Sequence, residues 1–393
     1  MVERVGDTAI GEVEPSERLD EDWSVVQALL PVGWELKARE LGALRRGRAI
    51  ADASTLLRVM LIHLAQGCGL RETAARAHEG GLASVSDVAI LKRLKGCGEW
   101  FKWMSEGLRQ RWLPEFPVLA SAWQGRRVRL VDGTMVSEPG DTGSQWRLHY
   151  SVGIPGLNCD EVIVTPPSEG ETLKRFTVTA GDILIGDRGY AHPAGIAHVV
   201  ARKGDVIIRT NLVTLPLHDA HGVRLEPLPL LRTLQVGHYA HWPVWVRHDK
   251  RLIAGRLCAV KKSAAAAHKA RQRVLRESQR GGSQVRAETL EAADYVFVFT
   301  TLGEDVSTQA VMELYRGRWQ IELAFKRLKS LVQLGHLKKH DPIAARAWLQ
   351  GKLLVAFLLD ALLESAERIS PWGYRCEHDP AQPLPLAGDF AHA

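Results

Sequence analysis

Charged side chains recur at helical spacing in LYRGRWQIELAFKRLKSLVQLGHLKK, the stretch from Leu314 to Lys339. The stretch lacks proline and is rich in good helix formers, which predicts one long helix. At about 100° per residue, four side chains fall within about 40° of Glu322: Tyr315, Arg318, Lys326 and Lys329. An unpaired charge on a largely buried helix is costly. The pattern therefore predicts either that the neighbouring cations neutralise Glu322 or that Glu322 holds a metal ion with ligands from elsewhere.

Two aspartates supply candidate ligands. Asp132 in RVRLVDGTMV and Asp187 in DILIGDRGY each follow an apolar, β-branched run, and each is expected to end a strand and begin a turn. Carboxylates at strand ends lie at the edge of an α/β sheet where sites form. With Glu322 they make three hard oxygen ligands, which suit Mg²⁺ or Mn²⁺. Two such ions about 4 Å apart can activate a water or a 3′-hydroxyl and stabilise the leaving oxygen at a phosphodiester.

Plainer interpretations remain open for each residue taken alone. Glu322 with cations at helical spacing is also typical of a solvated helix face, and aspartate before glycine is commonly a turn former. Asp182 and Asp205 also flank predicted strands, but the Arg-Gly-Tyr context favours Asp187 as the second ligand. We expect the three carboxylates of a real site to lie within about 12 Å of each other.

The combined motifs resemble a known family. The spacing Tyr315-x2-Arg318-x3-Glu322-x6-Lys329 is similar to the YREK signature of bacterial insertion-sequence DDE transposases. VDGT around Asp132 and GDRGY around Asp187 resemble the two aspartate motifs of that family. The order of aspartate, aspartate, insertion and glutamate also matches, and the resemblance covers about residues 50 to 360.

This resemblance implies a ribonuclease-H-like core with a β-strand insertion, and Asp132, Asp187 and Glu322 as ligands of two Mg²⁺ or Mn²⁺ ions. It implies DNA cleavage at transposon ends, strand transfer into target DNA and a homodimer that brings two ends together. Side chains implied to contact DNA are Tyr315, Arg318, Trp319, Lys326, Lys329, Arg188 and Tyr190. Relatives can place a flipped base against an aromatic residue of the insertion, for which the candidates here are Trp242, Trp245 and Tyr295. The alternatives are a nuclease of the same fold that only hydrolyses and a DNA-binding regulator without catalysis.

The elements that must position these residues follow from periodicity. Strands at RVRLVDGTMV, WRLHYSVGI, EVIVTP, DILIG and DVIIRTN, with a helix after Pro193, predict a mixed α/β sheet. Short glycine-separated helices precede it, and the basic residues Lys92, Arg93 and Lys95 are compatible with either a helix-turn-helix or a plain helical bundle. The predicted domains are an acidic tail (1–22), a helical DNA-binding domain (23–120), a first core part (121–211), a β-rich insertion (212–291), a second core part with the glutamate helix and a C-terminal helix (292–368), and a flexible tail (369–393).

Composition bounds the class of protein. The 393 residues carry a formal net charge of +6, with 46% hydrophobic and 24% charged residues, which is ordinary for a globular protein of two or three domains. The modest basic excess fits a polyanionic partner such as DNA. Five cysteines without a CxxC pair predict neither a disulfide framework nor a zinc site, and fit a cytoplasmic protein that meets the nucleoid when bound to DNA. The N-terminus lacks the apolar segment of a signal peptide, and the most apolar run, Leu353–Leu363, is too short to span a bilayer.

Overall fold

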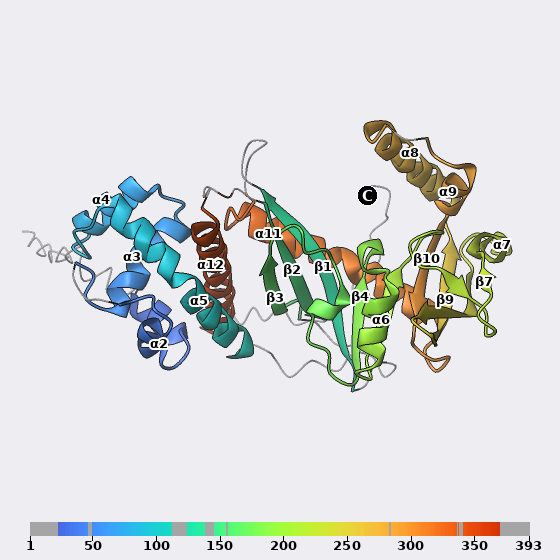
Figure 1. The fold of residues 1–393 in the computed structure, drawn as a ribbon, viewed down its shortest axis with the longest axis horizontal. Helices are drawn as coiled ribbons and strands as arrows, with labels where there is room; N and C mark the ends of the chain where they lie inside the picture. Colours follow the sequence, from blue (N-terminus) through green and yellow to red (C-terminus); the bar gives the residue numbers. More distant parts are fainter. Residues whose placement is uncertain are drawn as a thin grey trace, which may run out of the picture. The chain divides into compact units, whose positions relative to one another are not determined.

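The computed structural model describes residues 23–45, 49–111, 123, 125–137, 145–154, 156–282, 284–335, 337 and 341–369 (Figure 1). Of the predicted tails, residues 1–22 and 370–393 lie outside these ranges, as does Lys339, whereas Ile369 is the last residue of the last helix. The chain forms two compact units. The first holds the N-terminal helices and the last helix, and the second holds all the strands.

The first unit is a helical assembly. Its elements are α2 (Trp34–Glu40), α3 (Ala53–Ala65), α4 (Leu70–Glu79), α5 (Asp87–Arg111) and α12 (Pro342–Ile369). The helix α12 lies along α5 (Figure 1), and their close approach needs a glycine, because a Cβ at Gly98 would come within 3.3 Å of Ala347 Cα. We expected α12 to belong to the catalytic core, and its packing against α5 instead assigns it to the helical unit. None of the helices described is both long and apolar enough to span a bilayer.

The second unit is built on one ten-stranded mixed sheet of order β3-β2-β1-β4-β5-β10-β9-β8-β6-β7. Its first half comprises β1 (Arg127–Ser137), β2 (Gln145–Ile154), β3 (Cys159–Thr165), β4 (Asp182–Gly186) and β5 (Asp205–Arg209). The strands β1, β2 and β3 form an antiparallel meander, whereas β1, β4 and β5 run parallel. The predicted α/β class, with a mixed sheet core after a helical region, is confirmed.

The insertion continues the same sheet. Its elements are β6 (Leu217–His218), β7 (Arg224–Leu225), α7 (Pro227–Arg232), β8 (Tyr239–His248), β9 (Arg251–Lys261), α8 (Ala264–Arg280) and α9 (Ala287–Ala292), followed by β10 (Tyr295–Thr300). The strands β8 and β9 form a long antiparallel hairpin. Because β10 pairs with both β5 and β9, the insertion extends the core sheet sideways.

Short helices cover both faces of the sheet. The 3₁₀ turn η2 (Leu173–Arg175) packs on α6 (Pro193–Val200), and Leu173 and Ile196 share one apolar core with residues of β1, β4 and β5. A second layer consists of α10 (Thr308–Arg316), η4 (Gly317–Trp319) and α11 (Gln320–Ser330), with α11 crossing β1 and β2 (Figure 1). Phe325 of α11 packs 5.8 Å, between ring centroids, from Tyr150 of β2.

The single helix predicted from Leu314 to Lys339 was wrong. Ser307 caps α10 by accepting a hydrogen bond from the Ala310 amide, so the helical stretch begins before Leu314. A 3₁₀ turn at Gly317–Trp319 then separates α10 from α11. The helix α11 ends at Ser330, and Gln333 adopts a left-handed φ of 54°, which no α-helix accommodates.

Candidate active site

Asp132 and Asp187 lie at the same edge of the sheet. In the parallel pairing of β1 with β4, Leu130 is opposite Ile185, and each aspartate lies two residues further along its chain. Asp187 follows the end of β4 as predicted. The turn expected at Asp132-Gly133 is absent, because β1 continues to Ser137 through antiparallel pairing with β2. Asp132 therefore lies within a strand, just past the point where the parallel partner of that strand ends.

Each aspartate is held by its own backbone. Asp132 Oδ1 accepts a hydrogen bond from the Gly133 amide at 2.8 Å. Asp187 caps the 3₁₀ turn η3 (Arg188–Tyr190) by accepting from the Gly189 amide at 2.7 Å. These short local bonds orient both carboxylates without using the side-chain cations of the site.

The competing aspartates lie at the opposite ends of the strands. Asp182 begins β4, is buried, and accepts hydrogen bonds from Arg127 at 2.7 and 2.6 Å. Asp205 begins β5, pairs with Arg126 at 3.3 Å and accepts from the Thr301 hydroxyl at 2.8 Å. Both carboxylates thus have structural partners, and neither lies at the edge that carries Asp187.

Arg318 joins two of the predicted ligands. Its Nη2 donates to Glu322 Oε1 at 2.7 Å and its Nη1 lies 3.5 Å from Asp132 Oδ2. The Arg318 side chain is 17% exposed, whereas that of Glu322 is 61% exposed. A single guanidinium thus contacts a carboxylate from the sheet and one from α11. This arrangement agrees with the first possibility given for Glu322, in which a neighbouring cation neutralises it.

Two carboxyl groups of the site have raised pKa values. Burial raises the pKa of Asp132 to about 7, with Asp187 and Glu171 adding to the rise and Gly133 and Arg318 opposing it. Burial and the charge of Asp187 also raise the pKa of Glu171. Partly dehydrated carboxylates that raise each other's pKa favour the binding of a cation, because it relieves their repulsion.

These residues fit a divalent ion in chemistry but are not assembled as a finished ligand set. Carboxylate oxygens are the ligands that Mg²⁺ and Mn²⁺ prefer. In the part of the chain that the structure describes, no three His, Cys, Asp or Glu side chains converge closely enough to hold an ion. The Arg318 guanidinium contacts both Asp132 and Glu322.

The predicted DNA contacts divide by exposure. Arg188, Trp319, Lys326 and Lys329 are exposed and remain available to a large partner. Tyr190 is 0% exposed, so a direct DNA contact of this residue is contradicted, because its ring belongs to the apolar core beneath the site. Tyr315 is only 6% exposed, and its hydroxyl lies beside Arg318.

Glu171 is not among the predicted site residues. A glutamate in the loop SEGET follows no strand and fits no helical stripe, so no periodic signal marks it. The structure places its carboxylate against Gly133 and Gly189, the two glycines that hold the aspartates.

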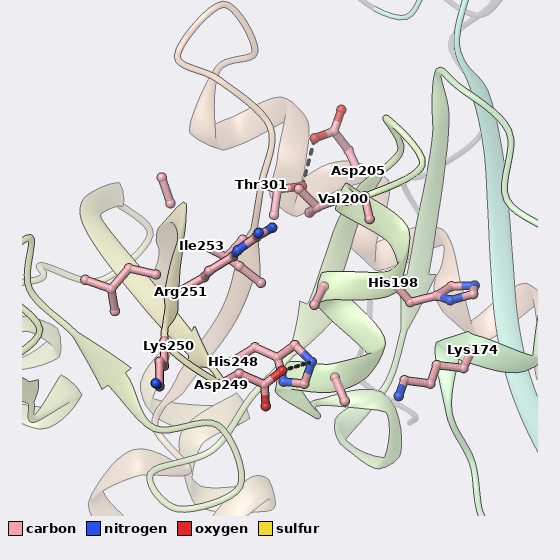
Figure 2. Close-up of a pocket in the computed structure, with 15 residues that line it drawn as sticks. Lys174, His198, Val200, Asp205, His248, Asp249, Lys250, Arg251, Ile253 and Thr301 are labelled. Carbon is pink, nitrogen blue, oxygen red and sulfur yellow. Dashed lines mark hydrogen bonds and ion pairs between the residues drawn. The ribbon is translucent and has the colours of Figure 1, made fainter.

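A separate hollow of about 1060 Å³ lies between α6 and the turn that joins β8 to β9 (Figure 2). Lys250 and Arg251 line it on one side, and His198 on the other. It borders Asp205, at the beginning of β5, and therefore lies at the edge of the sheet opposite to Asp187. This hollow is not the carboxylate site.

The chain is similar in sequence to known proteins. Residues 167–358 match the family described as Transposase DDE domain, a range that contains Asp187 and Glu322. A protein of Escherichia coli K12 named as a transposase of insertion sequence element IS186A is 37% identical over 360 residues, which cover 89% of this chain and 96% of that protein. This chain belongs to the insertion-sequence DDE transposases.

Two further relatives extend the comparison. The transposase of insertion sequence element IS421 of Escherichia coli is 37% identical over 361 residues, covering 89% of this chain and 96% of that protein. The transposase of IS231F of Bacillus thuringiensis subsp. israelensis is 26% identical over 278 residues, covering 61% of this chain and 57% of that protein. Similarity to the first two runs through nearly the whole chain. As a DDE transposase the protein is an enzyme of DNA transposition, and DDE transposases generally use divalent metal ions.

Proposed function

We propose that this DDE transposase cleaves phosphodiester bonds at the ends of its own insertion sequence and joins those ends to target DNA. Asp132, Asp187 and Glu322 are its catalytic carboxylates and the ligands of two Mg²⁺ or Mn²⁺ ions. The observation that carries the proposal is the meeting of Asp132 and Glu322, 190 positions apart in the chain, on one guanidinium, with the charge of Asp187 acting on Asp132. When bound, the ions supply activation of a water or 3′-hydroxyl and stabilisation of the leaving oxygen.

The side chains of the site have separate tasks. Asp132 and Asp187, fixed by the amides of Gly133 and Gly189, form the rigid part of the ligand set. Glu322 lies on the exposed face of α11 and completes the set when it is released from Arg318. The freed guanidinium is then able to bind a phosphate through two parallel hydrogen bonds.

DNA meets the site along the exposed cations. Lys326 and Lys329 extend from α11 and Arg188 from the turn after Asp187, so phosphates on both sides of the scissile bond have partners. Trp319 is 42% exposed and is available to stack on a base. We propose that the helical unit supplies end recognition and that two protomers act together, because two transposon ends must be joined in one event.

A regulator without catalysis is the less favoured alternative. Such a protein needs no partly buried aspartate whose pKa is raised by a second aspartate and a glutamate, since this arrangement costs stability. The remaining alternative, a nuclease of the same fold, differs only in its products.

The test is incubation of the full chain with Mg²⁺, labelled DNA that carries the ends of the element, and plasmid target. Joined products are expected from the wild type and not from Asp132→Asn, Asp187→Asn or Glu322→Gln. Asp249→Asn is the matched control, since Asp249 is 83% exposed in the β8–β9 turn. Cleavage without joining would identify the hydrolytic nuclease, and end binding without cleavage the regulator.

A further inference from the structure

Glu171 is a carboxylate that the DDE motif does not include. It precedes η2 on the face of the sheet opposite α11, and its side chain reaches the edge where the aspartates lie. A Cβ at Gly133 would lie 2.7 Å from Glu171 Oε1, and a Cβ at Gly189 would overlap Glu171 Oε2. The carboxylate therefore occupies the space that side chains at these two glycines would fill.

Glu171 and Asp187 approach a common point. The position that a Cβ of Gly189 would take lies 3.1 Å from Asp187 Oδ1 and closer still to Glu171 Oε2. Two carboxylates that meet in this way repel each other, and Arg147 is the one cation whose charge acts on Glu171 among the described residues. In the described ranges the Glu171 carboxylate has no hydrogen bond or ion pair that compensates its burial.

A second observation comes from Tyr190, which is not an acidic residue. Its side chain is 0% exposed, and its hydroxyl lacks a hydrogen-bond partner among the described residues. The charged groups that act on this hydroxyl are Glu171, Asp132, Asp187 and Arg147. A buried hydroxyl without a partner is costly. The Tyr190 hydroxyl gains a hydrogen-bond acceptor if a carboxylate rotates toward it when the site binds an ion.

We propose that Glu171 is a fourth carboxylate ligand of the divalent-ion site, shared with Asp187, and that Tyr190 positions it by hydrogen bonding. Glu171 enters from the η2 and α6 layer and Glu322 from α11, so each face of the sheet contributes one glutamate to the two aspartates at its edge. The inference rests on the proposed metal-dependent function and deepens it.

The glycines explain why the site is built this way. Gly133 has β-strand geometry within β1, where a side chain would ordinarily be favoured, and its lack of a Cβ leaves room for the Glu171 carboxylate in its present position. The same applies to Gly189 in η3.

The test measures Mn²⁺ binding by the full chain without DNA, from the paramagnetic resonance signal of free Mn²⁺. Glu171→Gln is expected to raise the Kd of at least one ion by about tenfold or more. The control is Glu169→Gln, the same change two residues away at a side chain that pairs with Arg175 and is 46% exposed, and it is expected to bind as the wild type does. Unchanged Mn²⁺ binding by Glu171→Gln overturns the proposal.

A second variant guards against misfolding of the first. Gly133→Ala displaces the Glu171 carboxylate while leaving its charge, and is expected to weaken Mn²⁺ binding. The double variant Gly133→Ala, Glu171→Gln should then bind no more weakly than Glu171→Gln alone, because both changes remove one ligand. If the double variant instead loses Mn²⁺ affinity equal to the sum of the two single losses, the two changes act independently and the proposal is contradicted. Wild-type Mn²⁺ binding through Glu171 without DNA cleavage would refute the proposed function and leave the fourth ligand standing.

Discussion

Removing the charge of Asp132 should stabilise the metal-free protein at neutral pH. The pKa of this carboxyl is raised from 3.8 to about 7, chiefly by burial. Because the folded-state pKa is above the unfolded one, the native protein binds more protons than the unfolded chain at pH values between the two. The free energy of unfolding therefore falls as the pH rises from the unfolded pKa to the folded one. The full shift corresponds to about 4 kcal/mol, and the part between pH 5.5 and 7 to about 2 kcal/mol.

The measurement compares the wild type with Asp132→Asn by urea denaturation in EDTA from pH 5.5 to 8. The variant does not titrate at this position, so its advantage in free energy of unfolding should grow by about 2 kcal/mol across the range. Mg²⁺ should remove that advantage at pH 8 by stabilising only the wild type. Asp249→Asn controls for loss of a surface carboxylate and should change stability by less than about 0.5 kcal/mol at every pH.

Parallel pH curves for the two proteins would refute the reasoning. They would mean that Asp132 ionises normally, and that water or Arg318 already compensates its burial. The electrostatic argument for a cation at this site would then fail, although the family assignment would not.

Three further predictions follow from particular contacts. Mn²⁺ affinity measured by calorimetry should fall about tenfold for each pH unit below 7, since the ion must displace the proton of Asp132, and a flat profile would exclude that competition. Arg129→Ala should cost about 3–5 kcal/mol in urea denaturation, because the buried Asp160 would lose its ion pair with Arg129 at 2.6 Å, and a loss below about 1 kcal/mol would show that water replaces the guanidinium. Gly255→Ala should cost about 1–3 kcal/mol, because its Cβ would come within 2.5 Å of the Thr300 carbonyl oxygen and 2.6 Å of the Phe299 ring, whereas wild-type stability would mean that both the backbone of β10 and the ring move aside.

Local patterns were sufficient where the determining contacts are local. Asp187 follows an apolar run and caps the turn after it, so its place at a strand end could be predicted from neighbouring residues. The four-residue helix spacing likewise predicted that Arg318 and Glu322 share one face, and they are hydrogen bonded. These motifs, all short in sequence, also predicted the family.

Other features depended on strand pairing and layer packing. Nothing near Asp132 shows that β1 continues past it, because the pairing with β2 supplies the hydrogen bonds that prevent a turn. Tyr190 looked like a surface residue beside a catalytic aspartate, yet it is buried because the chain turns inward at η3. Alternation and helical spacing report only which neighbours share a face, not what covers that face.

The amino-acid sequence by itself determined the types of the candidate catalytic side chains, their order and the family, because each motif is complete within a few residues. Only the tertiary structure decided that Arg318 spans Asp132 and Glu322, and that Glu171 lies against Gly133 and Gly189. These contacts join segments far apart in the chain. They form only when the two helical layers close on the sheet, and no local pattern encodes a distance across that core.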